Sequence, residues 1–447
     1  MHSSYDATAG ERHVTSVPYP ENRADRAGPP RYPGGMQLLR DRRLALLVSG
    51  QALNGIGSWC AIVALWGFAS FRFDAGPTAI ALLGLAWALP PLLLGPLAGV
   101  PIDRLGPKRV LMVADALAAV VSLLFLFAGS FPVLVALAAL HGVTSSFSEP
   151  ALRALPPRLV ADEDLVQANA LLGAASQSAI VFGPLLAAVA IGVIGIEGAF
   201  VIDALTYVIG VLVLIPIAIG RGADTRVESS VTADIREGFR VVHRRPRLRL
   251  LLGMSGCVYV IWGAFLVIEP VYVREVLHGS PTMLALLQTT FGVGLLLTTL
   301  VVTRLGERVA RVRIAAVAAA ASGVAATLYI GTAIPAVAFV GIGVWGCVTS
   351  FFVVPARTLI QRAAPVETHG RVMALDETVN SGGHLVALPL VGLAAAAVGV
   401  QVAGIAFAVV PIAGGLLTLW RVRQDHPASL PAPPDLYLEP PAQPAAA

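Results

Sequence analysis

The chain has 447 residues, of which 56% are hydrophobic and only 13% are charged, about half the charged share of an ordinary soluble domain. This composition excludes a soluble globular protein and makes membrane residence the first expectation. The three cysteines stand far apart inside apolar runs, which excludes a disulfide framework and a CxxC metal or redox site. We therefore expect no metal centre.

Long apolar runs between the two ends of the chain determine the fold class. They reach about 20 residues, the length at which a helix crosses a hydrocarbon core about 30 Å thick. Barrel strands would instead alternate in polarity over roughly ten residues, so we predict an all-α integral membrane protein. In chain order the twelve predicted helices span residues 44–71, 78–101, 109–129, 131–152, 166–190, 199–219, 250–275, 283–303, 312–331, 335–356, 373–397 and 401–420.

The distribution of positive charge predicts the topology. An even number of spans places both chain ends on one side, and on this topology 29 Lys and Arg residues fall on that side. Only Arg72 and Arg274 fall on the other. Because cytoplasmic loops are enriched in Lys and Arg, we expect a multi-pass protein of the cell membrane, surrounded by lipid, with both termini cytoplasmic.

Two tails and one basic loop divide the chain. Residues 1–40 lack the apolar segment of a secretory signal, and residues 422–447 are rich in Pro and Ala, so we predict two disordered cytoplasmic tails. Residues 221–249 carry eight arginines and the amphipathic run DIREGFRVVHRRPRLR. This favours an anchor on anionic lipid over a nucleic-acid patch. The remaining segments, 41–220 and 250–421, are predicted to form two bundles of six helices each.

The two predicted bundles repeat one another weakly. At an offset of 204 positions, Gly142, Arg153, Ala170 and Leu171 match Gly346, Arg357, Ala374 and Leu375. A parallel duplication of six plus six helices is what a transporter needs if one half is to rock against the other around a shared cavity at mid-depth.

The loop after the second predicted helix reads GVPIDRLGPKRV, residues 99–110. It resembles the signature loop between helices 2 and 3 of the major facilitator superfamily, Gly-x-x-x-Asp-Arg-x-Gly-x-(Arg/Lys)-(Arg/Lys). The runs PALRALPPRLVADEDLVQANAL, AFVIDALTY, EGFRVVHRRPRLRLLL and HGRVMAL are similar to those of macrolide-efflux and enterobactin exporters within that family. The resemblance covers all but the tails. It implies a secondary active transporter with no enzymatic activity and no cofactor.

The signature loop suggests a conformational latch. Gly99 allows close helix approach and Gly106 permits a sharp turn. Asp103 can face the positive N-terminus of another helix, and the family pattern implies helix 11. The three basic residues of the loop would hold it at the lipid headgroups; they are Arg104, Lys108 and Arg109. The alternative is that this charge cluster only fixes the topology.

The source of energy follows from an absence in the sequence. The single lysine, Lys108, does not lie in the Gly-x-x-x-x-Gly-Lys-(Ser/Thr) loop that an ATP-driven transporter requires. The family resemblance then implies coupling to protons, which needs a titratable side chain that faces the cavity within the membrane. Glu269, just before Pro270 in helix 7, is the first candidate. The alternatives are a structural cap and an ion pair with Arg274.

Other ionisable residues are weaker candidates for the proton. His384 is placed near the midplane of helix 11, where a hydrogen-bonded core histidine is the more common role. Asp203 is placed about four residues into helix 6, where a structural role is favoured. Glu149 has the i, i+4 spacing of a salt bridge with Arg153.

A cytoplasmic charge network is also predicted. Asp376 and Glu377 are expected to open helix 11, where the helix dipole favours acids, and to meet the arginines of the signature loop. Asp115, six residues into helix 3, and Arg153 would join them. Ala118 stands where the branch often has an arginine that pairs with this aspartate.

A packing motif in helix 5 and a set of polar and aromatic residues complete the candidates. The exporter pattern Gly-Pro-x-x-Gly-Gly survives only as Gly183-Pro184, which weakens the prediction of export. The candidate cavity residues are Asn54, Ser58, Trp59, Trp262, Gln288 and Trp345, although aromatics at such positions more often serve packing.

With few cavity charges, we predict proton-driven export of an apolar or amphipathic small molecule by a monomer that binds no nucleic acid. A nutrient importer or facilitator and a non-transporting receptor remain the alternatives.

Overall fold

The computed structural model describes residues 38–218, 231–365 and 368–424. Within these ranges it contains twelve helices that are long and apolar enough to cross a membrane, as predicted. The helices are α2 (Arg42–Gly67), α3 (Pro77–Leu94), α5 (Pro107–Leu124), α6 (Phe131–Arg153), α7 (Leu165–Ile194), α8 (Ile196–Leu214), α10 (Pro246–Glu275), α11 (Pro281–Leu305), α12 (Val312–Ile330), α13 (Pro335–Ala363), α14 (His369–Val398) and α15 (Val400–Gln424), with two shorter helices, α4 (Gly99–Leu105) and α9 (Val231–Arg244). The described residues contain no strand.

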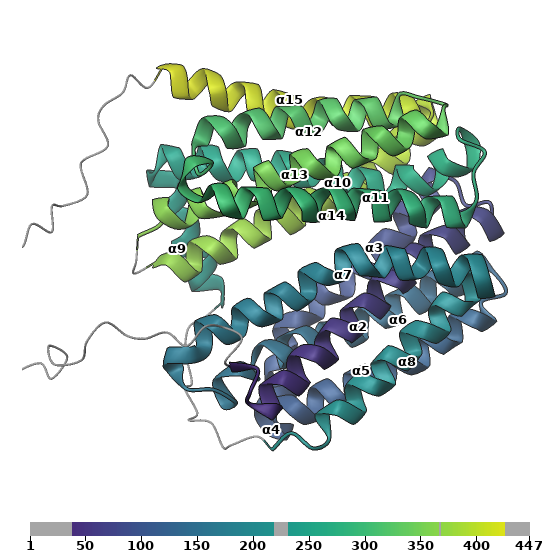
Figure 1. Cartoon of the computed structure of the whole chain (residues 1–447), viewed down its shortest axis with the longest axis vertical. Coiled ribbons are helices and arrows are strands. Elements are labelled where there is room, and N and C mark those ends of the chain that lie inside the picture. The colour runs from purple at the N-terminus through teal and green to yellow at the C-terminus, as the bar shows by residue number, and fades with distance from the viewer. Residues whose placement is uncertain (1–37, 219–230, 366–367, 425–447) are drawn as a thin grey trace, which may run out of the picture.

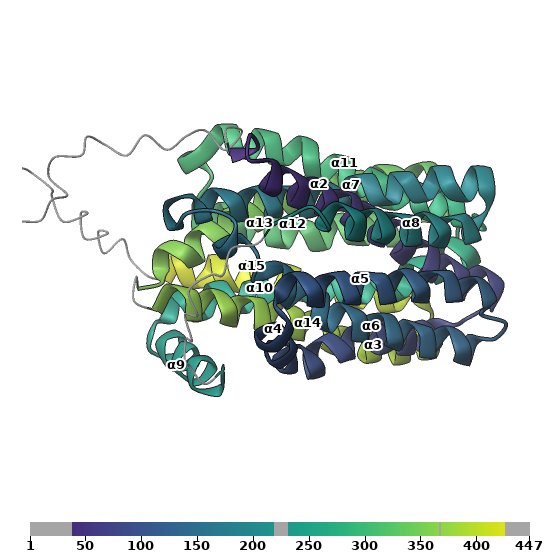
Figure 2. The same ribbon diagram turned by 90° about the horizontal axis from the view of Figure 1, so that it is seen from below.

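The helices form two bundles, α2–α8 and α10–α15, which we call the N-terminal and C-terminal bundles (Figures 1 and 2). In Figure 1 the bundles lie close together at one end of the molecule and diverge toward the end where α2 begins and α15 ends. Large hydrophobic side chains are exposed around the flank, as a lipid-facing surface requires, and Leu93 and Val113 are 66% and 59% exposed.

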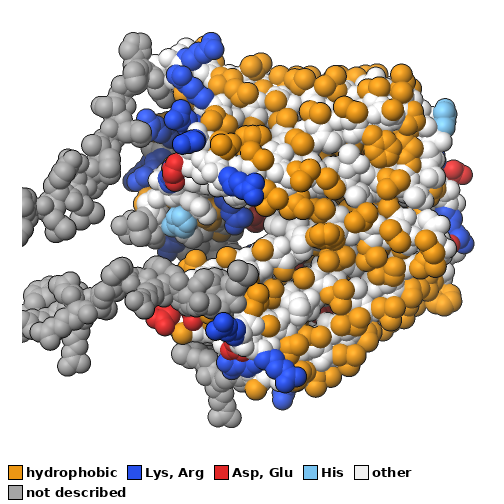
Figure 3. Space-filling model, viewed as in Figure 1, with side chains coloured by type: hydrophobic (Ala, Val, Ile, Leu, Met, Phe, Trp, Pro, Cys, Tyr) orange, Lys and Arg blue, Asp and Glu red, His pale blue; other side chains and the backbone are white. Residues whose placement is uncertain are grey.

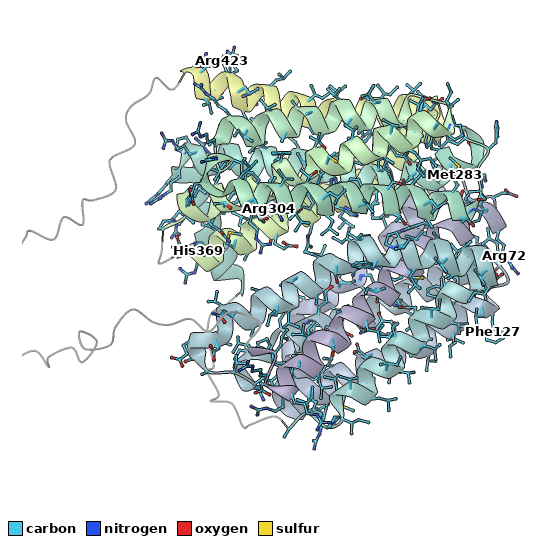
Figure 4. The ribbon with its side chains drawn as sticks, in the orientation of Figure 1. Arg72, Phe127, Met283, Arg304, His369 and Arg423 are labelled. Carbon is cyan, nitrogen blue, oxygen red and sulfur yellow. The ribbon has the colours of Figure 1, made fainter. Side chains whose placement is uncertain are left out.

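Positive charge gathers at the diverging end, which we call the basic face (Figure 3). It includes Arg104, Lys108, Arg109, Arg245, Arg304, Arg308, Arg362 and Arg423. Figure 4 places Arg304 and Arg423 at this end and Arg72 at the other, which we call the opposite face. At the basic face Asp41 caps α2 by accepting from the Arg43 backbone amide at 2.8 Å. The Arg43 side-chain hydrogen bond lowers the pKa of the Asp41 carboxyl.

The repeat between the halves has a matching structural role. A Cβ on Gly142 of α6 would lie 2.5 Å from the Trp87 carbonyl oxygen on α3, and a Cβ on Gly346 of α13 would overlap the Phe291 carbonyl oxygen on α11. The two glycines therefore permit the same close crossing, of helix 4 on helix 2 and of helix 10 on helix 8. This supports the parallel duplication.

Polar contacts join the bundles near the opposite face. The Ser70 hydroxyl, just after α2, donates to the Pro270 carbonyl oxygen on α10 at 3.0 Å. Arg274 donates in return to the Ser70 carbonyl oxygen. The Thr78 hydroxyl on α3 donates to the Gly392 carbonyl oxygen on α14 at 3.3 Å. We call these three hydrogen bonds the opposite-face gate.

Two helix boundaries differ from the sequence prediction in ways that move candidate residues. Helix α8 starts at Ile196, after Gly195 with φ of +86°, so Asp203 is its eighth residue rather than lying about one turn from the helix start. Helix α14 starts at His369, so Asp376 lies about two turns inside the helix and does not open it. Apolar residues stand on both sides of Gly195, and the polar residues His369 and Arg371 continue α14 ahead of its apolar run, so hydrophobicity alone marked neither boundary.

Candidate functional site

Three cavities lie along the interface of the bundles. The central cavity, about 530 Å³, is lined from the N-terminal bundle by residues that include Asn54, Ser58, Trp59, Asp115, His141, Ser148, Glu149, Arg153 and Tyr207. The inter-bundle pocket, about 120 Å³, is lined from both bundles by residues that include Trp59, Trp66, Trp262, Glu269, Gln288, Trp345 and His384. The C-bundle cavity, about 350 Å³, is lined by residues that include Arg153, Ser255, Arg357, Asp376, Glu377 and Asn380.

Shared lining residues connect these spaces. Trp59 and Ile62 on α2 line both the central cavity and the inter-bundle pocket, and Arg153 at the end of α6 lines both the central and the C-bundle cavity. The six predicted cavity residues therefore all line the central cavity, the inter-bundle pocket or both. Whether they contact a substrate remains a prediction.

Asp115 belongs to the wall of the central cavity. Its carboxylate accepts from the Ser148 hydroxyl of α6 at 3.1 Å and from the Asn54 amide of α2 at 3.4 Å. The side chain is almost fully buried. The structure therefore places two neutral hydrogen-bond donors next to Asp115 inside the bundle. The sequence had predicted that this residue belongs to the cytoplasmic charge network.

A chain of polar groups runs deeper into the same bundle. The Ser58 hydroxyl on α2 donates to the Tyr207 hydroxyl on α8 at 3.1 Å. The Tyr207 oxygen lies 3.4 Å from His141 Nε2 on α6, and the His141 ring stacks on Trp87 with centroids 4.2 Å apart. Neither His141 nor Tyr207 was among the residues predicted from the sequence. Their position within apolar spans, where polar groups need partners, is the signal that could have identified them.

Asp203 is the most deeply buried carboxylate of the N-terminal bundle. It is 0% exposed, and its Oδ2 accepts from the Ser122 hydroxyl of α5 at 2.5 Å. Its Oδ1 has no hydrogen-bond partner among the described residues. A buried carboxyl oxygen without a donor is costly when the group is ionised, so this residue needs an explanation beyond packing.

Glu269 occupies the inter-bundle pocket from α10. The Tyr329 hydroxyl of α12 donates to its Oε1 at 2.7 Å, and the Gln288 amide of α11 donates to its Oε2. The side chain is 3% exposed. Tyr329 was missed by the sequence analysis because its pairing depends on how α10 packs on α12.

Arg274 does not pair with Glu269, which removes one structural alternative for that carboxylate. Its guanidinium lies 3.6 Å from Asp74 Oδ1 and 2.6 Å from Glu275 Oε1. It also donates to the Ser70 carbonyl oxygen in the opposite-face gate. Glu269 is therefore held by two neutral donors while the nearby cation is engaged at the opposite face.

Aromatic and aliphatic side chains share the remaining wall of the inter-bundle pocket. The indole N–H of Trp345 donates to the Ser322 hydroxyl at 2.8 Å. The indole N–H groups of Trp66 and Trp262 have no partner among the described residues. The pocket is thus mainly apolar, and its lining includes the carboxylate of Glu269 and two tryptophans whose indole N–H groups are unused, a combination suited to an amphipathic ligand.

His384 lines the same pocket from α14. Its backbone carbonyl lies so close to Gly263 of α10 that a Cβ on that glycine would overlap it. Helix 5 packs comparably closely, since a Cβ on Gly183 would overlap the Trp59 side chain and lie 3.0 Å from the Ile56 carbonyl oxygen. Gly183 and the adjacent Pro184 are buried, so this remnant of the exporter pattern sits where α7 meets α2.

The signature loop adopts the predicted turn, with Gly106 at φ of +84°. Lys108 donates to the carbonyl oxygens of Ile215 and Ile217, both at 2.8 Å, and so fastens the start of α5 to the end of α8. Asp103 is exposed and makes no hydrogen bond or ion pair with any described residue. The latch contact with helix 11 is not formed in this conformation, and the role of the loop as a latch stays a prediction.

Gly99 behaves differently from the expectation of close packing. A Cβ on Gly99 would meet nothing within 4 Å, so no helix packs closely against this glycine in the present conformation. Arg104 and Arg109 are exposed at the same end.

The other charged candidates divide between the two sides of the cleft. Glu149 lies 3.9 Å from Arg153 in the predicted i, i+4 ion pair, with both side chains mostly exposed. Asp376 and Glu377 line the C-bundle cavity near Arg357. Among the described residues no group of three or more His, Cys, Asp or Glu side chains is placed to hold a metal ion.

Comparison with known proteins decides the family. Residues 47–268 and 251–444 each match the model of the Major Facilitator Superfamily. The chain belongs to the major facilitator superfamily. The uncharacterized MFS-type transporter YfiS of Bacillus subtilis (strain 168) is 25% identical over 86% of this chain and 94% of its own length. Macrolide efflux protein A of Streptococcus pyogenes is 24% identical over 72% of this chain and 82% of its own length.

Solved structures show the same fold at low sequence identity. The crystal structure of a bacterial homolog to the human lysosomal transporter Spinster, in an inward-facing and unoccupied conformation, aligns with a TM-score of 0.68. The alignment covers 86% of this chain and 97% of that one, at 14% identity. Because the family model matches both halves of the chain, the protein is a multi-pass membrane transporter of the major facilitator superfamily, a family that is not enzymatic.

Proposed function

We propose that the protein exports an apolar or amphipathic small molecule across the cell membrane in exchange for protons, by alternating access. In this proposal the basic face is cytoplasmic, as the excess of Lys and Arg favours, and the conformation described above is the inward-open one. The protein acts as a monomer in lipid. The relationship to Macrolide efflux protein A supports export as the direction.

The observation that carries the proposal is the position of Glu269. It is a buried carboxylate with no cationic partner among the described residues, held by Tyr329 and Gln288 in a pocket that both bundles line. A group in that position senses both the relative placement of the bundles and whatever occupies the pocket. Substrate and proton can then compete for one site, which is the simplest way to exchange one for the other.

The apolar wall defines the class of substrate. The aromatic side chains of the pocket offer stacking and apolar contact, while the free indole N–H groups of Trp66 and Trp262 can donate to a carbonyl, ether or hydroxyl oxygen. A substrate with an apolar body and a few hydrogen-bonding oxygens fits these features. The larger central cavity, about 530 Å³, would admit it from the basic face.

The test is transport by purified protein in inside-out vesicles with an imposed pH gradient. We expect uptake of hydrophobic compounds into the vesicles that a protonophore abolishes and that Glu269→Gln uncouples from the gradient. Glu197→Gln is the control, because this acid is exposed at the opposite face and pairs with Arg72, outside the gate. Transport in the inward direction would identify an importer, and binding without flux would identify a receptor; either result overturns the proposal.

A further inference from the structure

Asp203 presents a problem that the proposed function does not solve. Its side chain is 0% exposed and its Oδ1 lacks a partner among the described residues. The Lys and Arg residues of the described N-terminal bundle all lie at helix ends. An ionised carboxylate here would have neither a counter-charge nor a donor for one of its oxygens. A protonated carboxyl group removes both difficulties, because its O–H can be directed at an acceptor.

The groups that face Asp203 offer such an acceptor. Ser58 and Cys60 approach from α2, Asp115 and Ser122 lie on α5, and Tyr207 stands one turn further along α8. Ser122 already donates its proton to the carboxylate. Ser58 donates its own proton to Tyr207, which leaves the Ser58 oxygen able to accept one.

The hydrogen bonds beyond Ser58 all point the same way. Tyr207 accepts from Ser58, so its single proton is available for His141 Nε2 at 3.4 Å. The His141 proton then resides on Nδ1, an atom without a partner among the described residues. Ser58, Tyr207 and His141 all line the central cavity, whereas Asp203 does not. A directed hydrogen-bonded chain therefore runs from Ser58 through Tyr207 to His141 at a cavity able to hold water, and Ser58 is the neighbour through which the closed Asp203 carboxyl group would join it.

We propose that Asp203 is a second proton-binding site, loaded and emptied through the Ser58 and Tyr207 hydroxyls and the His141 imidazole, so that the transporter moves two protons per substrate, one on each bundle. On release, the Asp203 proton passes to the Ser58 oxygen while the Ser58 proton passes to the Tyr207 oxygen. The Tyr207 proton passes to His141 Nε2, and His141 gives its Nδ1 proton to water. One proton leaves Asp203 and one reaches the cavity, and the relay groups end neutral.

The stoichiometry part of this proposal rests on the proposed function, but proton binding at Asp203 does not. The whole route lies within α2, α6 and α8 of one bundle, so rocking of the bundles leaves it intact. Only the face to which the central cavity opens changes. Asp203 would then exchange protons with whichever side the cavity faces, as Glu269 does from the other bundle.

The first experiment needs no transport. Infrared difference spectra of the purified protein, recorded during titration in H₂O and D₂O, report the carbonyl stretch of each protonated carboxyl group. We expect Asp203→Asn to remove one such band and Glu269→Gln to remove a different one. Tyr207→Phe should keep the Asp203 band but slow its H/D exchange about 100-fold, the scale of a lost proton-transfer group.

A matched control separates the relay from general damage to α8. The Thr206 hydroxyl donates to the Asp203 backbone oxygen at 2.8 Å and takes no part in the route. Thr206→Val should leave both the band and its exchange rate unchanged. An unchanged spectrum in Asp203→Asn, or unchanged exchange in Tyr207→Phe, would overturn the proposed site. The Tyr207→Phe result decides the question if Asp203→Asn does not fold.

The second experiment measures the ratio of protons to substrate from reversal potentials in proteoliposomes. We expect a ratio of two in the wild type and one in Asp203→Asn, with substrate affinity retained. A ratio that is the same in both overturns the stoichiometry. If the wild type shows no proton coupling while the Asp203 band is present and mutable, the proton site stands and the proposed function fails together with the stoichiometry.

Discussion

The opposite-face gate gives a quantitative prediction for the double variant Ser70→Ala, Thr78→Val. The Ser70 hydroxyl is fully buried and bonds Pro270 at 3.0 Å, and the Thr78 hydroxyl bonds Gly392 at 3.3 Å. Both contacts join one bundle to the other, so both must break when this face opens. A hydrogen bond contributes about 1 kcal/mol net. Losing two should shift the equilibrium by about 2 kcal/mol, or about 30-fold, toward opening at this face.

The assay is labelling of Leu284→Cys by a membrane-impermeant thiol reagent added from the opposite face. Leu284 lines the inter-bundle pocket and is 2% exposed. It reacts from that side only while the gate is open, so its labelling rate follows the open population. We expect the rate to rise about 30-fold in the double variant. The labelling rate of the protein that keeps Leu284 is subtracted, which removes the contribution of the three native cysteines.

Thr327→Val is the control, since its hydroxyl bonds the Gly323 carbonyl oxygen within α12 and crosses no interface. It should leave the labelling rate unchanged. A labelling rate that stays the same in the gate variant would show that these hydrogen bonds form equally well in both conformations. The identification of the gate would then be wrong.

Three further predictions concern helix packing, the Glu269 site and the signature loop. Gly346→Ala should destabilise the protein by about 1–3 kcal/mol through overpacking, seen as a lower melting temperature, whereas Gly99→Ala, which has open space, should not. Tyr329→Phe removes a donor to Glu269 and should slow proton-driven transport about tenfold, the scale of a hydrogen bond to a charged group. Tyr272→Phe, which changes the neighbouring ring, should slow transport less. Equal effects of the two substitutions would argue against a specific role for Tyr329. If the latch stabilises the state open at the opposite face by about 1 kcal/mol, Asp103→Asn should lower the Leu284→Cys labelling rate about fivefold. A higher labelling rate would mean that the latch stabilises the other state.

The helices were predictable because a membrane imposes one dominant requirement on them. Apolar length alone located twelve spans, and the structure places a helix on each. The predicted start of α14 was wrong because this requirement weakens outside the apolar run. The polar residues before 373 continue the helix back to His369. The duplication was visible in Gly142 and Gly346 because a close helix crossing tolerates no side chain there.

The site was predictable only in part, because hydrogen-bond partners come from helices far apart in the sequence. Glu269 stood out as an acid inside an apolar run, but its partner Tyr329 is 60 positions away. Asp115 was assigned to the charge network because nothing in the sequence specifies that α5 turns it toward Asn54 and Ser148. Residue type identifies a buried polar group, whereas bundle packing selects its partner.

The arrangement on α10 links the proton candidate to the gate. Glu269 and Pro270 are adjacent, and the Pro270 carbonyl accepts the Ser70 hydroxyl while Arg274, one turn later, donates to the Ser70 backbone. Binding of a proton or a substrate at Glu269 therefore acts on the same helical turn that closes the opposite face. Any movement of that turn is transmitted to both hydrogen bonds with Ser70 at once. Occupancy of the pocket and closure of the gate can then be coupled within a single helix, without a longer path through the protein.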